Sequence, residues 1–178
     1  MKTIIDLHTS RQTFDYDCGV KALQTLMAYY GVYLREDKLI KELGTEAEGT
    51  RVGRMIAVAQ AKGFEVKVHE HMTIQEVKDY VDRGRPVIVL LQAWADRLMT
   101  LKDWHKDYED GHYAIVIGYD DKTLIFEDPG SFRRTWLTEH EFMVRWHDLD
   151  RVDGHRYEHF GLVLLGKEPV VHYPEHMN

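Results

Sequence analysis

Apolar residues in the first third of the chain recur every three or four positions, which is the spacing of one face of an α-helix. The clearest case spans residues 17–30 and ends before Gly31, a residue that commonly terminates helices. Its apolar face consists of Ala22, Leu23, Leu26, Met27 and Tyr30. The same pattern, again followed by glycine, predicts helices over residues 35–43 and 52–62. The N-terminal part of the chain is therefore expected to be helical.

From residue 64 the pattern changes to alternating apolar and polar residues, the period of a strand with one buried face. Two Thr-x-x-Glu pairs, Thr73 with Glu76 and Thr138 with Glu141, each predict the start of a further helix. Four more runs, rich in β-branched and aromatic residues, are predicted strands: residues 86–92, 112–119, 123–128 and 160–166. Helices first and mostly antiparallel strands later predict an α+β fold.

The runs at 112–119 and 123–128 are close enough in sequence to form a hairpin, whose register decides which side chains share a face. A three-residue connection places Asp128 on the same face as His112. A two-residue turn at Asp121 and Lys122 points Asp128 to the opposite face. Because a type I′ turn needs positive φ at both positions, Asp-Lys suits it poorly. We therefore predict the three-residue connection or an equivalent bulge.

Composition narrows the class of protein. The chain has 178 residues, 44% of them hydrophobic, and 30 acidic against 23 basic side chains give a net charge of −7. A chain of this length buries about 70% of its extended surface, so one domain is expected over residues 1–178. We expect its core over about residues 10–166 and a loosely attached C-terminal extension over residues 167–178. The acidic balance argues against nucleic acid as a partner, because phosphates are neutralised by Lys and Arg.

No apolar run approaches the about 18 residues that a membrane span needs, so no span is expected in this chain. The N-terminus carries charged residues before any apolar stretch long enough for a signal peptide. A cytoplasmic protein is the simplest expectation. The oligomeric state is not predicted by these patterns.

Cys18 is the single cysteine of the chain, which excludes an internal disulfide and a site with paired thiolates. It lies at the predicted start of the first helix, where unpaired N–H groups and the helix dipole favour a thiolate. Gly19 permits close approach of other groups. Asp15 and Asp17 are expected to cap the helix, although their charge disfavours a neighbouring thiolate. A small buried thiol is the alternative interpretation.

Three other residues favour a reactive thiol. Gln12 lies six positions before Cys18, and its amide can fold back to stabilise an oxyanion together with the Cys18 N–H. His112 opens a predicted strand, where an imidazole can face a cleft, and Asp128 can orient that imidazole. Solvated or structural roles are the alternatives for Gln12 and for any one of the 11 histidines.

Three segments resemble the motifs of cysteine peptidase family thirty-nine. They are QTFDYDCGVKALQTLMAYYG at residues 12–31, RGRPVIVLLQ at residues 83–92 and GHYAIVIGYDDKTLIFEDPG at residues 111–130. This family belongs to the papain-like clan, and the resemblance covers about residues 10–166. It implies a papain-like fold in which an N-terminal helical half packs on a mostly antiparallel sheet. The implied roles are nucleophile for Cys18, general base and acid for His112, orienting group for Asp128, and oxyanion-hole donor for Gln12. No metal or organic cofactor is implied.

The family is best known for removing leader peptides after a double glycine, usually as the N-terminal domain of an ATP-driven exporter. Neither a membrane domain nor a Walker A loop occurs in the 178 residues, so we expect a standalone domain. Its expected partner is a peptide or protein substrate, and a separate peptide exporter is a candidate partner. The insertion at 93–110 is interpreted either as a cleft-side loop that helps select substrate or as a packed surface segment.

Three alternatives stay open. The same thioester intermediate supports transfer to an amine, which gives a transpeptidase or amide ligase in place of a hydrolase. A catalytically inactive papain-like module that binds peptides is the second alternative. A metal protein is the third, prompted by the pairs His69/His71, His155/His159 and His172/His176, although these lack the HExxH arrangement of zinc peptidases.

Overall fold

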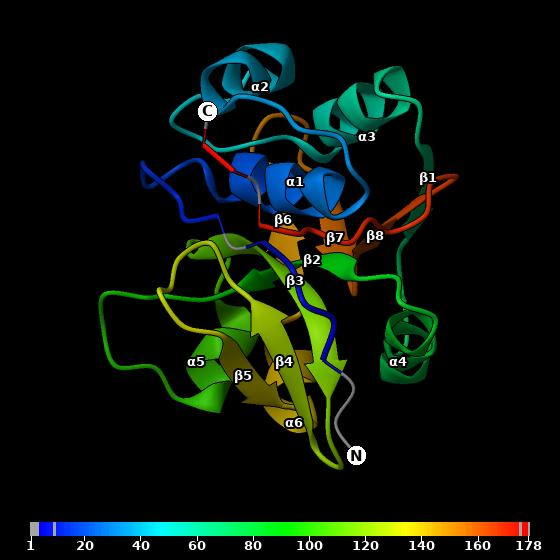
Figure 1. Cartoon of the computed structure of the whole chain (residues 1–178). Helices are drawn as coiled ribbons and strands as arrows, with labels where there is room; N and C mark the ends of the chain where they lie inside the picture. The colour runs from blue at the N-terminus through cyan, green and yellow to red at the C-terminus, as the bar shows by residue number, and fades with distance from the viewer. Residues whose placement is uncertain (1–3, 9, 175, 178) are drawn as a thin grey trace.

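Three helices open the fold in the computed structural model, which describes residues 4–8, 10–174 and 176–177 (Figure 1). They are α1 (Cys18–Tyr29), α2 (Glu36–Leu43) and α3 (Val52–Ala61), close to the ranges predicted from the apolar periodicity. The glycine after each helix has a positive φ, 77° at Gly31, 61° at Gly44 and 84° at Gly63. Because glycine adopts this conformation without a steric penalty, these residues end the helices as predicted.

The rest of the described chain forms strands with short helices between them. The elements are β1 (Glu65–His69), α4 (Ile74–Asp82), β2 (Val87–Gln92), α5 (Leu101–Lys106), β3 (Gly111–Tyr119), β4 (Thr123–Glu127), β5 (Thr135–Thr138), α6 (Glu139–Arg145), β6 (His147–Leu149), β7 (Arg156–Glu158) and β8 (Gly161–Leu165). Six strands form one sheet in the order β1-β8-β2-β3-β4-β5, and each neighbouring pair is antiparallel. The α+β prediction is confirmed.

Helix α1 lies between the sheet and the helices α2 and α3 (Figure 1). It packs on β3, while β2 at the centre of the sheet is buried along its whole length. Leu23, Leu26 and Met27 of α1 are fully buried, as their shared face predicted. This packing sets the N-terminus of α1, which begins with Cys18, against the strand that carries His112.

The hairpin of β3 and β4 reaches its register through a bulge. The turn itself has two residues, because Asp120 N donates to Thr123 O at 3.0 Å, so the three-residue connection was wrong. Between Val116 and Gly118 the register shifts by one residue, and Ile115 then pairs with Glu127. That is the register of the three-residue connection, so the equivalent bulge that the sequence suggested is confirmed.

Both predicted capping boxes are present, at Thr73 in front of α4 and at Thr138 in front of α6. The segment 93–110 contains a further short helix, α5, which was not predicted. It also begins with a capping box, formed by Thr100 with Asp103. An aspartate in place of the usual glutamate, together with only six helical residues, made this start harder to recognise.

The first part of the C-terminal extension contacts the body of the protein. Val170 N donates to Tyr29 O at 3.0 Å, at the end of α1. Arg85 forms an ion pair of 2.8 Å with Glu168. In the described part of the chain, no helix has the length and apolar character needed to cross a membrane.

Candidate active site

Cys18 is the first residue of α1, and its side chain is almost fully buried. Asp17 occupies the N-cap position but does not cap the helix with its side chain, which corrects the expected role. Its carboxylate bends back and accepts hydrogen bonds from Thr13 N at 3.0 Å and Phe14 N at 3.2 Å. Burial raises the pKa of Asp17, while the two backbone N–H groups lower it. Asp17 therefore fixes the loop before Cys18. Its side chain does not cap the first turn of α1.

A close contact at Gly19 sets Cys18 against the sheet. A Cβ atom at Gly19 would lie 2.8 Å from Thr50 Cβ and 3.0 Å from Tyr113 Cδ2, so only glycine fits between them. The Tyr113 hydroxyl also donates to Thr50 O at 2.8 Å. The loop after α2, the start of α1 and the start of β3 are thereby joined directly beside Cys18 and His112.

His112 and Asp128 form a buried pair. His112 Nε2 lies 2.7 Å from Asp128 Oδ1, and the two residues are 6% and 4% exposed. Gly130 N donates to the same carboxylate oxygen at 2.8 Å, and Thr135 Oγ1 donates to Oδ2 at 3.1 Å. Trp94 Nε1 is a second donor to Oδ2, at 3.2 Å. Four donors hold the Asp128 carboxylate in one orientation toward the imidazole.

The electrostatics of this pair favour a charged imidazole. Burial alone lowers the pKa of His112, but hydrogen bonds with Asp128 and Cys18 and their negative charges outweigh it and raise the pKa to about 10. Burial raises the pKa of Asp128, yet the His112 hydrogen bond and charge and the Gly130 N–H bring it below its usual value. His112 and Asp128 therefore behave as an ion pair at neutral pH.

Cys18 is the second group, after Asp128, that raises the pKa of the His112 imidazole. Because Nε2 is engaged by Asp128, Nδ1 is the ring nitrogen left for the thiol. The structure thus brings together three of the four residues singled out in the sequence. The buried position of Cys18 alone matches the inert alternative, but its place beside the imidazole of His112 favours the reactive one.

Gln12, the fourth residue, lies beside the turn that contains Asp128, since Gln12 N donates to Pro129 O at 3.0 Å. Its side-chain Nε2 donates to Phe14 O at 3.1 Å, a contact that the sequence did not predict. A primary amide nitrogen carries two protons, so one remains for another acceptor. Arg11, the preceding residue, forms a 2.6 Å ion pair with Glu127, which joins the Gln12 loop to the end of β4.

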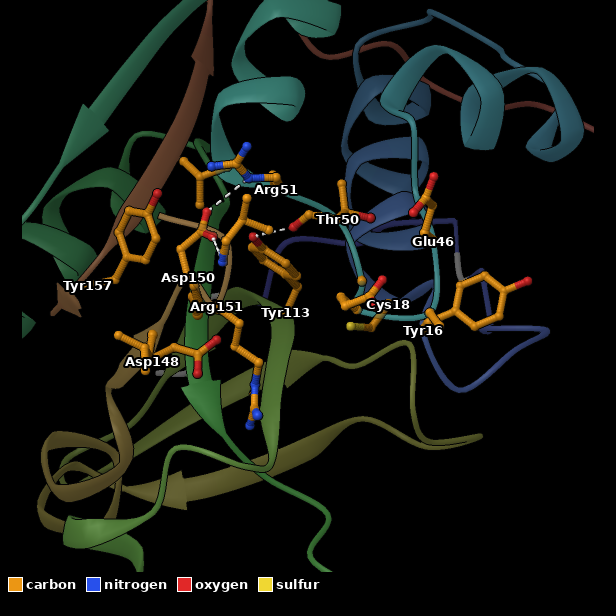
Figure 2. A pocket seen from close by; sticks show the side chains of 18 of the residues that line it. Tyr16, Cys18, Glu46, Thr50, Arg51, Tyr113, Asp148, Asp150, Arg151 and Tyr157 are labelled. Carbon is orange, nitrogen blue, oxygen red and sulfur yellow. Dashed lines mark hydrogen bonds and ion pairs between the residues drawn. The ribbon is translucent and has the colours of Figure 1, made fainter. Parts of the chain in front are cut away.

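A cavity of about 490 Å³ opens beside Cys18. Its walls include Thr50, Tyr113 and Asp148, and Figure 2 shows Asp148 and Tyr157 on the side opposite Cys18. The Asp148 carboxylate lies against Gly111, where a Cβ would be 2.5 Å from Asp148 Oδ2. Such a concave, partly polar site suits a peptide side chain.

Four of the charged residues around this cavity form ion pairs with one another. Arg51 contacts Asp150 at 3.1 Å, and Arg151 contacts Glu109 at 2.9 Å. Sequence reasoning missed these wall residues, because they come from loops without a recognisable motif. Trp94 belongs to the segment 93–110, and no sequence signal links it to Asp128.

Histidines considered for metal binding have other partners. His69 Nε2 lies 3.0 Å from Tyr80 OH, and His155 Nε2 lies 2.8 Å from Glu70 Oε1. Among the residues that the structure describes, no three His, Cys, Asp or Glu side chains are grouped so that they could hold a metal ion.

A cysteine at a helix N-terminus, facing a histidine on an antiparallel sheet, is the arrangement of the papain-like cysteine peptidase fold. The chain belongs to the Peptidase C39 family, whose sequence profile matches residues 6–149. An uncharacterized protein of Methanothermobacter marburgensis is 27% identical over 123 residues, which are 69% of this chain and 72% of that protein.

Solved structures with the same fold include the peptidase domain of Streptococcus ComA, a bi-functional ABC transporter involved in a quorum sensing pathway. It has a TM-score of 0.64 and 24% identity and covers 90% of this chain and 97% of its own. A C39-like peptidase from Bacillus anthracis has a TM-score of 0.71 and 17% identity over 96% of this chain and all (100%) of its own. A double glycine motif protease from an AMS/PCAT transporter, solved with its leader peptide, has a TM-score of 0.63 and 16% identity over 90% and 92%.

Proposed function

We propose that this protein is a thiol-dependent peptidase that hydrolyses an amide bond of a peptide substrate. The observation that carries the proposal is the 2.7 Å contact between His112 and Asp128, with Cys18 as the other partner of the same imidazole. A buried carboxylate that orients a histidine next to a thiol is the arrangement that activates a cysteine nucleophile. Membership in the Peptidase C39 family supports the same reaction.

In the proposed reaction, His112 starts as the imidazolium that holds the proton of Cys18, and the Cys18 thiolate attacks the carbonyl carbon of the scissile bond. Negative charge then develops on the carbonyl oxygen. The N–H of Cys18 and the free amide proton of Gln12 are the proposed donors to this oxyanion. As the C–N bond breaks, His112 gives its proton to the leaving amine, and a thioester forms on Cys18.

Water completes the cycle. His112, again neutral, takes a proton from water while the oxygen attacks the thioester carbon, and the same donors stabilise the second oxyanion. Cys18 leaves as the thiolate and the imidazolium is restored. Asp128 keeps the ring oriented in both half-reactions. An amine that replaces water at this step gives transfer in place of hydrolysis.

The proposed substrate is a peptide whose side chain enters the cavity beside Cys18. This cavity of about 490 Å³ is lined by tyrosines and by residues of both charges, so it suits a polar side chain. The double glycine motif protease of similar fold was solved with a leader peptide, which supports a peptide as the class of substrate.

Labelling of Cys18 tests the reactive thiol. Because the chain has one cysteine, the mass of the intact protein reports its alkylation by iodoacetamide directly. We expect rapid alkylation near neutral pH and a strong slowing in His112→Ala. His69→Ala is a matched control, since this histidine binds Tyr80 on another part of the fold and its loss should leave the rate unchanged.

Peptide cleavage tests the reaction itself. A peptide library analysed by mass spectrometry should yield cleaved products with the wild type, and Cys18→Ala should yield none. We expect His112→Ala to lose about a hundredfold or more in rate. Peptides that bind and stay intact, together with slow labelling that ignores His112, would contradict the proposal and favour an inactive peptide-binding module. Added amines that appear in the product would instead identify a transferase.

A further inference from the structure

Trp94 has a backbone conformation that its residue type disfavours. Its φ is 65°, in the left-handed region where the Cβ of a bulky residue is strained. Burial does not account for this conformation, because the side chain is 57% exposed. Strained residues of this kind persist where surrounding contacts fix them, and they concentrate at functional sites.

The contact that accounts for the conformation is made by the indole. Trp94 Nε1 donates to Asp128 Oδ2 at 3.2 Å, while Asp128 Oδ1 accepts from His112 Nε2 at 2.7 Å. Trp94 and His112 therefore engage different oxygens of the same carboxylate. With both oxygens held, the carboxylate cannot rotate without losing a hydrogen bond.

Gly130 shows how closely these side chains approach one another. A Cβ at this position would lie 3.0 Å from Trp94 Nε1, 3.3 Å from Asp128 Oδ1 and 3.3 Å from His112 Cε1. The glycine thus leaves the space in which the indole reaches the carboxylate. Trp94 and Asp128 also line a small cavity of about 130 Å³ on this side of the sheet.

The sheet holds the base of the segment from which Trp94 projects. Gln92, the last residue of β2, pairs with Gly111, and Ala93 N donates to Asp110 O at 2.9 Å. Residue 94 therefore leaves the ladder next to the start of β3, three residues after Leu91, which lies opposite His112. The positive φ turns the chain at this point and directs the indole to Asp128.

We propose that Trp94 is a positioning residue, which holds the Asp128 carboxylate through its indole N–H so that the opposite oxygen faces His112. This inference rests on the proposed peptidase function. It gives the segment 93–110 a role beyond packing, since the first bulky residue of that segment reaches the site.

Two substitutions separate this role from a structural one. Trp94→Phe keeps an aromatic ring but removes the N–H donor, and it should lower kcat about tenfold with KM nearly unchanged, as loss of an orienting partner does. The acidic side of the profile of kcat against pH should move to higher pH. The reason is that the Asp128 carboxylate becomes a weaker acid when it loses a hydrogen-bond donor. Trp94→Gly relieves the positive φ, so we expect an unchanged or higher Tm together with the same loss of rate.

Trp136→Phe is the matched control. Trp136 lines the same small cavity and is 64% exposed, but it lies on β5 and its substitution should leave kcat and the pH profile as in the wild type. The rate of Cys18 alkylation against pH is measured for all variants as well, so that the comparison does not depend on the substrate chosen. Trp94→Phe should slow alkylation at neutral pH.

The outcomes distinguish the two proposals. If Cys18 reacts in the wild type and the Trp94→Phe variant has the same rate and the same pH profile, the proposed role of Trp94 is wrong. The peptidase proposal is then unaffected. A Trp94→Gly variant whose loss of rate is matched by a lower Tm overturns it as well, because the residue is then structural. A wild type whose Cys18 does not react overturns the peptidase proposal and the role of Trp94 together.

Discussion

Arg11 and Glu127 form an ion pair of 2.6 Å that joins the loop before Cys18 to the strand that precedes Asp128. Glu127 is 2% exposed, and a second cation, Arg134, lies 3.6 Å from its other oxygen. The two residues that form this pair are the sequence neighbours of Gln12 and Asp128. The pair therefore links the loop that carries the proposed oxyanion donor to the strand that leads to the proposed orienting carboxylate.

Replacing Arg11 with alanine leaves the Glu127 carboxylate buried with only the more distant Arg134 near it. We expect the free energy of unfolding to fall by about 3 kcal/mol, the lower end for breaking a buried pair. Urea denaturation measures this loss. Arg35→Ala removes an exposed pair with Asp37 and should leave the free energy of unfolding nearly unchanged. Equal losses in the two variants would contradict the structural importance of the Arg11–Glu127 pair.

A methyl group at Gly19 should separate α1 from the sheet. Gly19→Ala places a Cβ within 2.8 Å of Thr50 Cβ, so helix and loop must move apart and the free energy of unfolding should fall. Overpacking of this kind costs about 1–3 kcal/mol. Because Cys18 is the adjacent residue, its alkylation should slow in the same variant.

Gly53→Ala provides the control for this prediction, since nothing lies within 4 Å of a Cβ at that position in α3. There the substitution should stabilise the helix by about 1 kcal/mol. Thermal unfolding measures the stability of both variants. A Gly19→Ala protein as stable as Gly53→Ala would be inconsistent with the close contact at Thr50.

The charge of His112 should make the free energy of unfolding depend on pH in the alkaline range. Its partners raise the pKa from 6.5 to about 10, so the stabilisation is complete below 6.5 and is lost as the pH rises toward 10. The difference in free energy of unfolding between the wild type and His112→Gln should shrink between pH 7 and 10. A difference that stays constant over this range would argue against a charged His112.

Asp128→Asn should move this transition. The substitution removes one of the two partners that raise the pKa of His112, so the imidazole should lose its proton at a lower pH than in the wild type. NMR titration of the His112 ring measures the shift directly. An unchanged titration would mean that Asp128 does not determine the protonation of His112.

Sequence patterns predicted the larger elements well, because their physical causes are local. The face of α1 and the positive φ of Gly31 follow from residues within one helix. Helix α5 was not predicted, because a helix of six residues is too short to show a recognisable apolar periodicity. The joining of Cys18, His112 and Asp128 followed from helix start and strand register, which short-range patterns also determine.

Other features depend on contacts that no local pattern reveals. Asp17 has the right type and place for a helix cap, yet its carboxylate binds Thr13 and Phe14 because the loop before it folds back. The side chain of Gln12 reaches Phe14 for the same reason. Asp148 lines the cavity only because β6 is brought beside the start of β3, a tertiary contact between distant segments.

The bulge between Val116 and Gly118 divides the β3–β4 hairpin into two parts with different register. The part next to the turn has the register set by the two-residue turn at Asp121 and Lys122. The part beyond the bulge has the register that places Asp128 on the same face as His112. Loop length and bulge therefore compensate each other. A homologous chain with one more residue in this turn would need no bulge to preserve the His–Asp pair, so insertions and bulges at this hairpin are expected to exclude one another across relatives.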